Sequence, residues 1–314
     1  MTACTSSCCD TVTGRTATVK LGKGTVDISP GRKLIASNAV FEIPEMHLDA
    51  PPARVRFRLE GPVAATAELL NNEKLRDFAG GTFLDPATSR GSVTAQIALS
   101  LPLAREVPKA SVNYNINLDL ANFSAERMLL GQKVESALLK VTATNQTYQI
   151  KGDVKINGTM AQREYRKVAG EPEPEVRIQA TLDEAARARL GFELGGTVSG
   201  PIPVKISGRV AANERDNKFT VEADLTAAKI DNLLPGWVKP SGWPVRASFA
   251  LISRDQSMRF EDIFVDGSGA TLRGAIEVDS SHELMSVNFP VFGLTEGDKA
   301  SLKADRGPDG SLRV

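Results

Sequence analysis

Residues 111–120 alternate apolar with polar side chains, and this two-residue period is the feature that most constrains the fold. The apolar positions are Val112, Tyr114, Ile116, Leu118 and Leu120, and between them stand Asn113, Asn115, Asn117 and Asp119. Neighbouring side chains of a β-strand point to opposite faces, so the segment predicts a strand with one apolar and one polar face. The apolar face needs an apolar neighbour.

The same period returns along the whole chain, in residues 54–60, 93–100, 148–156, 204–210, 219–225 and 270–278. Turn signals separate such segments, among them Asn157-Gly158, Asp266-Gly267 and Asp309-Gly310. Strands that are apolar on one side only and are joined by tight turns are typical of antiparallel meanders, whereas parallel sheets are buried on both faces. The sequence therefore predicts a mainly β, antiparallel fold.

Two short helices interrupt this pattern. Residues 64–78 combine apolar and charged positions at helical spacing and stop before Gly80-Gly81. The second helix is expected to start at Thr181, which has Glu184 three residues later in the spacing of a capping box, and to stop at Gly191.

Residues 168–175 are the best internal boundary, because they combine Gly170, Pro172 and Pro174 with three glutamates. We expect an atypical or disordered start over residues 1–15, a first β-groove segment over 16–167 and a second over 176–314. Residues 301–304 and 311–314 predict a hairpin whose second strand is cut off, and this favours a fragment of a longer chain.

The composition excludes several functional classes. The 38 basic and 38 acidic side chains cancel, which argues against nucleic-acid binding through massed Lys and Arg. Aromatic residues are 5% of the chain, so the apolar faces are aliphatic and suit acyl chains better than rings. No stretch reaches the ~20 apolar residues that span a bilayer, and the start lacks the regions of a secretion signal.

Residues that could carry chemistry are sparse. The cysteines Cys4, Cys8 and Cys9 have no spaced partner ligands, and His47 and His282 stand far apart, so no metal site or cofactor is expected. Hydrolase, phosphate-loop and metalloprotease motifs are absent from the sequence.

Two carboxylate pairs are candidates for the acids of a glycan-cleaving enzyme. Glu261-Asp262 lies in a strand, where adjacent side chains are expected on opposite faces, and Asp183-Glu184 lies at a helix start, where acids offset the dipole. Trp237 and Trp243 flank a Pro-rich connection, where packing over a loop is favoured over a membrane or ligand mouth. The sequence therefore favours a protein without catalysis.

Six segments carry a resemblance to a known family: residues 53–62 and 83–91 in the first half, and the runs 181–191, 198–204, 223–228 and 236–240 in the second half. In this order they resemble the AsmA-like envelope proteins, most closely the YhdP-like branch. The resemblance covers most of the chain from about residue 32. It implies an elongated, curled antiparallel sheet with an open hydrophobic groove and a few short helices.

The resemblance further implies a non-catalytic segment that carries phospholipid acyl chains in the groove between the inner and outer membranes. The full-length protein would be periplasmic and anchored in the inner membrane, with the anchor absent from this chain. Phospholipids and the two membranes would be its partners, without nucleic acid. The inward candidates for lipid binding are Val112, Tyr114, Ile116, Leu118, Val204, Ile206, Val221, Leu225, Leu272 and Ile276.

Two alternatives fit the same alternation. A structural or adhesive envelope β-module would seal its apolar faces in a closed core, and a glycan-active β enzyme would need two carboxylates converging in a cleft.

Overall fold

The computed structural model of the chain describes residues 8–72, 84–129, 132–190, 195–210, 217–231, 237–253, 257–281, 283–307 and 311–313. The fold is mainly β, with 67% strand and 7% helix, and this confirms the predicted antiparallel class. Two compact units make up the chain. Unit 1 comprises Met1–Ile156 and Arg166–Gly170, and unit 2 comprises Asn157–Tyr165 and Glu171–Val314.

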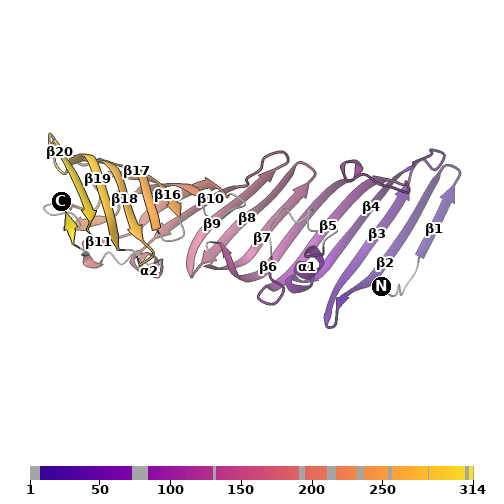
Figure 1. Cartoon of the computed structure of the whole chain (residues 1–314). Coiled ribbons are helices and arrows are strands. Elements are labelled where there is room, and N and C mark those ends of the chain that lie inside the picture. The colour runs from indigo at the N-terminus through magenta and orange to yellow at the C-terminus, as the bar shows by residue number, and fades with distance from the viewer. Residues whose placement is uncertain are drawn as a thin grey trace. The chain divides into compact units, whose positions relative to one another are not determined.

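Unit 1 is a meander in which each strand is antiparallel to the next (Figure 1). Its strands are β1 (Cys8–Thr13), β2 (Thr16–Ser29), β3 (Arg32–Ile43), β4 (Pro52–Pro62), β5 (Arg90–Pro102), β6 (Asn113–Leu129), β7 (Gln132–Thr144) and β8 (Thr147–Ile156). A 3-10 turn, η2 (Lys109–Ser111), precedes β6. The alternation holds in β6, where Tyr114, Ile116 and Leu118 are half-buried while the Asn and Asp residues between them are exposed.

Helix α1 (Val63–Leu70) follows β4 and contacts β2, β3, β4 and β5. Its buried residues are Val63, Ala65, Thr66 and Ala67, small enough to let the helix approach the sheet closely. On its exposed side Glu68 accepts hydrogen bonds from Ser29 and Arg32 of the β2–β3 hairpin. The predicted helix over 64–78 is thus present as a shorter one, and residues 73–83 lie outside the described residues.

Unit 2 repeats the antiparallel meander with shorter strands (Figure 1). They are β10 (Glu175–Leu182), β12 (Ile202–Arg209), β13 (Lys218–Asp224), β16 (Arg246–Ser253), β17 (Ser257–Gly267), β18 (Ala270–Asp279), β19 (Leu284–Gly293), β20 (Ala300–Arg306) and β21 (Leu312–Arg313). The pairing of β20 with β21 confirms the predicted C-terminal hairpin in its described part.

A second, small sheet belongs to unit 2 and consists of β11 (Val198–Ser199), β14 (Lys229–Asp231) and β15 (Val238–Lys239), preceded by the turn η3 (Gly195–Thr197). It contributes Val198, Ile230 and Trp237 to a buried cluster with Ile202 and Val204 of β12. The small sheet therefore covers part of the apolar face of the large one.

Two buried cationic side chains donate hydrogen bonds to backbone carbonyls in and beside the small sheet. The Lys239 ammonium, 1% exposed, donates to the carbonyl oxygens of Ala228 at 2.6 Å and Pro240 at 3.0 Å, and burial lowers its pKa. The Arg187 guanidinium donates to the carbonyls of Leu182, Val198 and Gly200 at 2.8 to 2.9 Å. Buried charges of this kind persist because hydrogen bonds replace their hydration.

Helix α2 (Glu184–Arg189) begins differently from the prediction. Its N-cap is Asp183, whose carboxylate accepts from the Ala186 amide at 2.7 Å, while Thr181 still belongs to β10. The capping-box assignment to Thr181 was therefore wrong, because Asp183 stands nearer to the free amides of the first turn. The prediction that Asp183 and Glu184 lie at the start of a helix is confirmed. The predicted end of this helix at Gly191 lies outside the described residues.

Two further expectations are corrected. The residues Cys8–Thr13 form β1, paired with β2, in place of the expected disordered start, because the β-branched run 11–13 suits an antiparallel pair. The turn expected at Asp266-Gly267 lies two residues later, where Ser268 and Gly269 have φ of 50° and 84°. Asn157-Gly158 forms its predicted turn, and Asp309-Gly310 lies outside the described residues.

The predicted linker over 168–175 lies close to the division between the units. The boundary between the units falls within strand β9 (Thr159–Val168), after Tyr165, and again after Gly170. A turn and bends follow β9, and β10 begins at Glu175. Glycine and two prolines in this short stretch keep it from continuing either strand.

Candidate functional site

Unit 1 carries a continuous apolar face that runs across its strands. The register places Phe57, Ile97 and Ile116 directly opposite one another in β4, β5 and β6, and continues through Ala143 to Tyr148. The neighbouring row joins Leu59, Ala95, Leu118, Val141 and Ile150 in the same way. The cross-strand partners share a face, so the apolar side chains of five strands form one surface.

On this face the apolar side chains beside α1 are buried, and most of those further along β4, β5 and β6 are half-buried, with the exception of Ala53. In the row that begins at Gly61, Val93 is 2% exposed, Leu120 8% and Leu139 3%. Further along the same strands Phe57, Ile97 and Ile116 are half-buried, as are Val55, Leu99 and Tyr114. Helix α1 therefore accompanies the buried end of the face, whereas the other end keeps apolar side chains in partial contact with solvent.

Unit 2 has an equivalent face. One row joins Phe219, Leu251, Phe260, Ile276, Val287 and Ala304 across six strands. Leu272, Val287, Phe289 and Ala304 form a buried cluster on it, against which Ile263, Ile276, Phe292 and other half-buried side chains pack. At the β10–β13 end the small sheet covers the face.

The ten predicted lipid-binding residues divide between these two faces. Those that are half-buried are Val112, Tyr114, Ile116, Leu118, Ile206, Leu225 and Ile276, and those that are buried are Val204, Val221 and Leu272. Val204 belongs to the cluster under the small sheet, and Leu225 packs against that cluster. The half-buried members are the ones within reach of a ligand, and burial raises the pKa of the Tyr114 hydroxyl.

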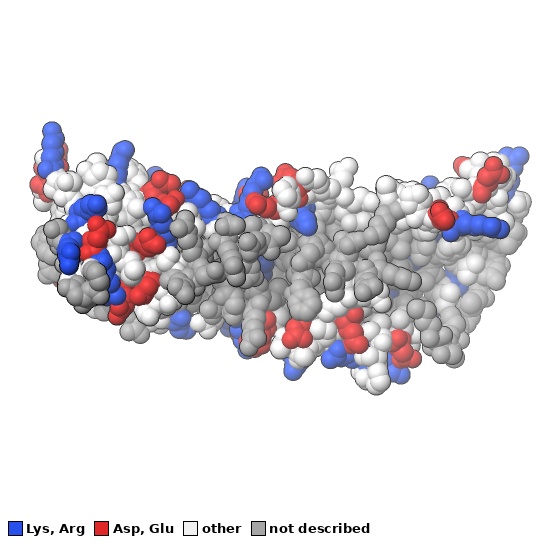
Figure 2. Space-filling model, viewed as in Figure 1, with Lys and Arg blue, Asp and Glu red and all other residues white. Residues whose placement is uncertain are grey.

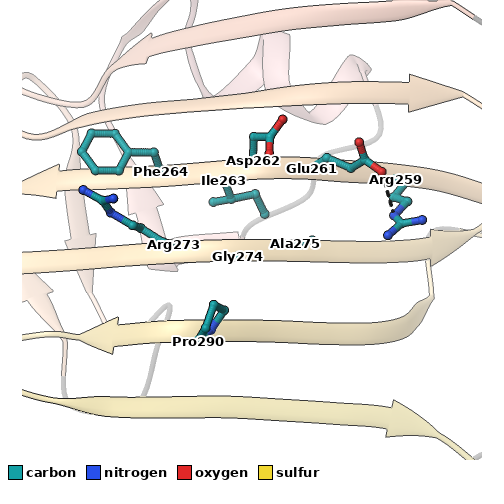
Figure 3. Close-up of a pocket in the computed structure, with 9 residues that line it drawn as sticks. All are labelled: Arg259, Glu261, Asp262, Ile263, Phe264, Arg273, Gly274, Ala275 and Pro290. Carbon is teal, nitrogen blue, oxygen red and sulfur yellow. Dashed lines mark ion pairs between the residues drawn. The ribbon is translucent and has the colours of Figure 1, made fainter.

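A second feature lies on the opposite, polar face of unit 2. A hollow of about 590 Å³ is lined by residues of three adjacent strands, β17, β18 and β19, including Arg259, Glu261, Asp262, Phe264 and Arg273 (Figure 3). The register shifts here in all four strand pairs from β16 to β20. Aligned bulges bend a sheet and re-aim its side chains, so they account for a hollow on an otherwise flat surface.

The bulge in β17 overturns the expectation that Glu261 and Asp262 point to opposite faces. Asp262 has φ of 52°, and both carboxylates line the hollow and lie near the Lys218 ammonium, at 3.9 Å and 3.8 Å. Glu261 also pairs with Arg259 at 3.2 Å. Both carboxylates therefore have cations within ion-pair distance.

The Arg273 guanidinium differs from its neighbours. It lies over the Phe264 ring, 5.0 Å from the centroid, and among the described residues it has no ion pair. Gly274 and Pro290 interrupt the strands β18 and β19, and they are the sequence signals that could have indicated this site. Such residues in a strand interior mark bulges and close backbone approaches.

Two arginines on the polar face of unit 1 are paired. A shallower hollow of about 450 Å³ in unit 1 contains Arg56 and Arg58, which bind Glu42 at 3.1 Å and Glu60 at 2.7 Å. Figure 2 shows the same interspersion of Lys and Arg with Asp and Glu on the side in view.

The other candidates from the sequence are two tryptophans, two histidines and three cysteines. Trp237 is 6% exposed and packs in the buried cluster, as favoured, whereas Trp243 is 54% exposed. His47 is exposed, the side chains of Cys8 and Cys9 are not described, and Cys4 and His282 lie outside the described residues. No group of metal-ligating side chains occurs in the part of the chain that the structure describes.

Comparison with protein-family models, curated proteins and solved structures found no match. None of the described helices has the length and apolar character to cross a membrane.

Proposed function

We propose that this chain is a non-catalytic segment of an AsmA/YhdP-like protein whose apolar sheet faces carry phospholipid acyl chains. The observation that supports this most is the row Phe57, Ile97 and Ile116, where three large apolar side chains on adjacent strands are opposite one another and only half-buried. Contiguous exposed apolar surface, unlike single exposed residues, marks a binding surface.

The chemistry of the faces suits hydrocarbon. They consist mainly of Val, Ile, Leu, Ala and Phe side chains, and each methylene of a ligand buried there contributes ~0.8 kcal/mol. A chain of some ten methylenes would thus gain several kcal/mol without any hydrogen bond. The headgroup would stay in water, and no catalytic residue is needed.

In this proposal the full-length protein works in the periplasm, anchored in the inner membrane, and phospholipids pass between the inner and outer membranes. The pairing of acidic and basic side chains on the polar faces is compatible with a protein that has no nucleic-acid partner.

Lipid capture by matched variants tests the proposal. Ile116→Asp places a charge on the apolar face, whereas Asn117→Asp places it on the exposed face of the same strand. Ile206→Asp and Ser207→Asp form the equivalent pair in β12. Mass spectrometry of lipids retained after gentle purification should show loss in the first member of each pair and retention in the second.

Two results would contradict acyl binding. One is wild-type protein that retains no lipid and takes up none from vesicles, and the other is equal retention by folded Ile116→Asp and Asn117→Asp. Leu272→Asp is a poor test, because Leu272 is 4% exposed within a cluster and a charge there would unfold the unit.

A structural envelope module is the second candidate. It is favoured by the small sheet, which seals one end of the face in unit 2 with Val198, Ile230 and Trp237. If the faces serve only as a core, no lipid accompanies the protein, and the aspartate variants lose stability without losing a ligand.

A further inference from the structure

We propose that the hollow over β17–β19 binds a phosphate group through Arg273. The site is separate from the apolar faces of the proposed lipid carrier, because Arg273 and Phe264 are cross-strand partners on the polar side of the sheet, whereas Val265 and Leu272 face the apolar side. The inference therefore does not depend on acyl-chain binding.

The charges of the hollow leave one cation available. Lys218 lies near both Glu261 and Asp262, and Arg259 pairs with Glu261. Both carboxylates that line the hollow thus have cations within ion-pair distance, and Arg273 is the lining cation for which the described residues supply no acid. In Figure 3 it extends toward Phe264, at the opposite end of the hollow from the Arg259–Glu261 pair. An anion at Arg273 would give this guanidinium an ionic partner.

The geometry favours a planar, two-point contact. The Phe264 ring lies beneath the Arg273 guanidinium, and such stacking limits the orientations of a flexible side chain while leaving its N–H edge free to donate. A guanidinium held in this way binds two oxygens of one phosphate in parallel, and these charge-assisted hydrogen bonds are stronger than neutral ones.

The sheet itself is shaped around this position. Asp262 lies outside the pairing register of β17 with β18, and Gly274 pairs with Ile263, the next residue of β17. A Cβ on Gly274 would collide with the Asn288 carbonyl oxygen and the Phe289 ring, so the close approach of β18 and β19 requires glycine there. The hollow therefore lies where the ladder between β17 and β18 is irregular.

The phosphate could belong to a small soluble molecule or to a lipid headgroup, and two binding arms separate these sources. The first titrates the intact chain with inorganic phosphate and follows the ³¹P line width. The second measures cosedimentation with phosphatidylcholine vesicles that contain phosphatidic acid, against vesicles of phosphatidylcholine alone. Millimolar affinity is the order expected for a single phosphate contact.

Three variants identify the residue responsible. Arg273→Gln should weaken binding about tenfold or more, the equivalent of losing a charged hydrogen bond. Arg273→Lys should lose less phosphate affinity, because lysine keeps the positive charge but lacks the two parallel N–H donors of the guanidinium. Arg177→Gln is the control, since it removes an arginine paired with Glu175 on β10 of the same unit, and it should bind like the wild type. Thermal melts establish that each variant is folded.

Each outcome bears on the site. Loss of inorganic phosphate binding in Arg273→Gln alone supports a soluble phosphate ligand, and the same variant pattern seen only with phosphatidic acid supports a headgroup. Absence of binding in both arms, or equal losses in Arg273→Gln and Arg177→Gln, would overturn the proposal.

Discussion

Replacing Arg187 with methionine should destabilise unit 2 by about 3 kcal/mol. The Arg187 side chain is 5% exposed and donates to three carbonyl oxygens, those of Leu182, Val198 and Gly200. Methionine keeps most of the packing but donates to none of them. At about 1 kcal/mol for each buried acceptor left without a partner, the three losses give that figure.

Tryptophan fluorescence during urea unfolding measures this effect in the right part of the molecule. The chain has 2 tryptophans, Trp237 and Trp243, and both belong to unit 2. The urea concentration at the midpoint of unfolding should fall, whereas the dependence of the free energy of unfolding on urea should not change, because the same surface is exposed on unfolding.

Two companion variants define the cause. Arg189→Met changes an exposed arginine of the same helix and should stay within about 0.5 kcal/mol of the wild type. Arg187→Lys should recover part of the loss, because an ammonium keeps the charge but cannot reach all three carbonyls with one planar group. If Arg187→Met unfolds at the wild-type midpoint, the three hydrogen bonds do not hold the small sheet and the reasoning fails.

Three further changes test other parts of the fold. Hydrogen bonds from Arg32 and Ser29 lower the pKa of the Glu68 carboxyl, so the stability that they contribute is present above the unfolded value of 4.5 and is lost as the pH falls below it. In Glu68→Gln the protection of α1 against hydrogen exchange should lose this dependence on acid. An unchanged pH profile would contradict the assignment. Gly274→Ala should lower stability by about 1 to 3 kcal/mol in calorimetry, whereas Gly24→Ala, in open space, should not, and equal effects would refute the close approach. Trp237→Ala should lower the free energy of unfolding, followed by circular dichroism, by about 3 to 5 kcal/mol, whereas Trp243→Ala, at an exposed position, should lower it little. A small effect of both substitutions would mean that the cluster around Trp237 is not a core.

The sequence predicted the strands well because alternation is a local property. In β6 every polar residue from Asn113 to Asp119 is exposed, and the β20–β21 hairpin forms as its pattern indicates. Helix boundaries were less accurate. The helix after β4 ends at Leu70, and Asp183 caps the other in place of Thr181, because cap choice depends on backbone geometry that spacing does not determine.

The hollow at Arg273 was missed for a related reason. A period of two assigns every residue to a face only while the strand is regular, and one bulge changes that assignment for Asp262. Gly274 and Pro290 signal an irregularity, but several strands must shift together to make a hollow, and their alignment depends on long-range register.

The alternation of apolar and polar residues does not determine what covers an apolar face. In both units one end of the face is covered, but by different elements. In unit 1 a helix with small buried residues accompanies the buried end of the face, and in unit 2 a three-stranded sheet held by Arg187 and Lys239 covers one end. Each cover is held by hydrogen bonds or an ion pair, and the rows beyond it combine buried side chains with half-buried ones such as Phe57, Ile97 and Ile116. Closing the rest would require only a longer helix or another strand, and apolar surface left in water forgoes ~25 cal/mol for each Å². Retention of such surface in contiguous rows is what a face for hydrocarbon ligands requires, and a sealed module would gain stability by losing it.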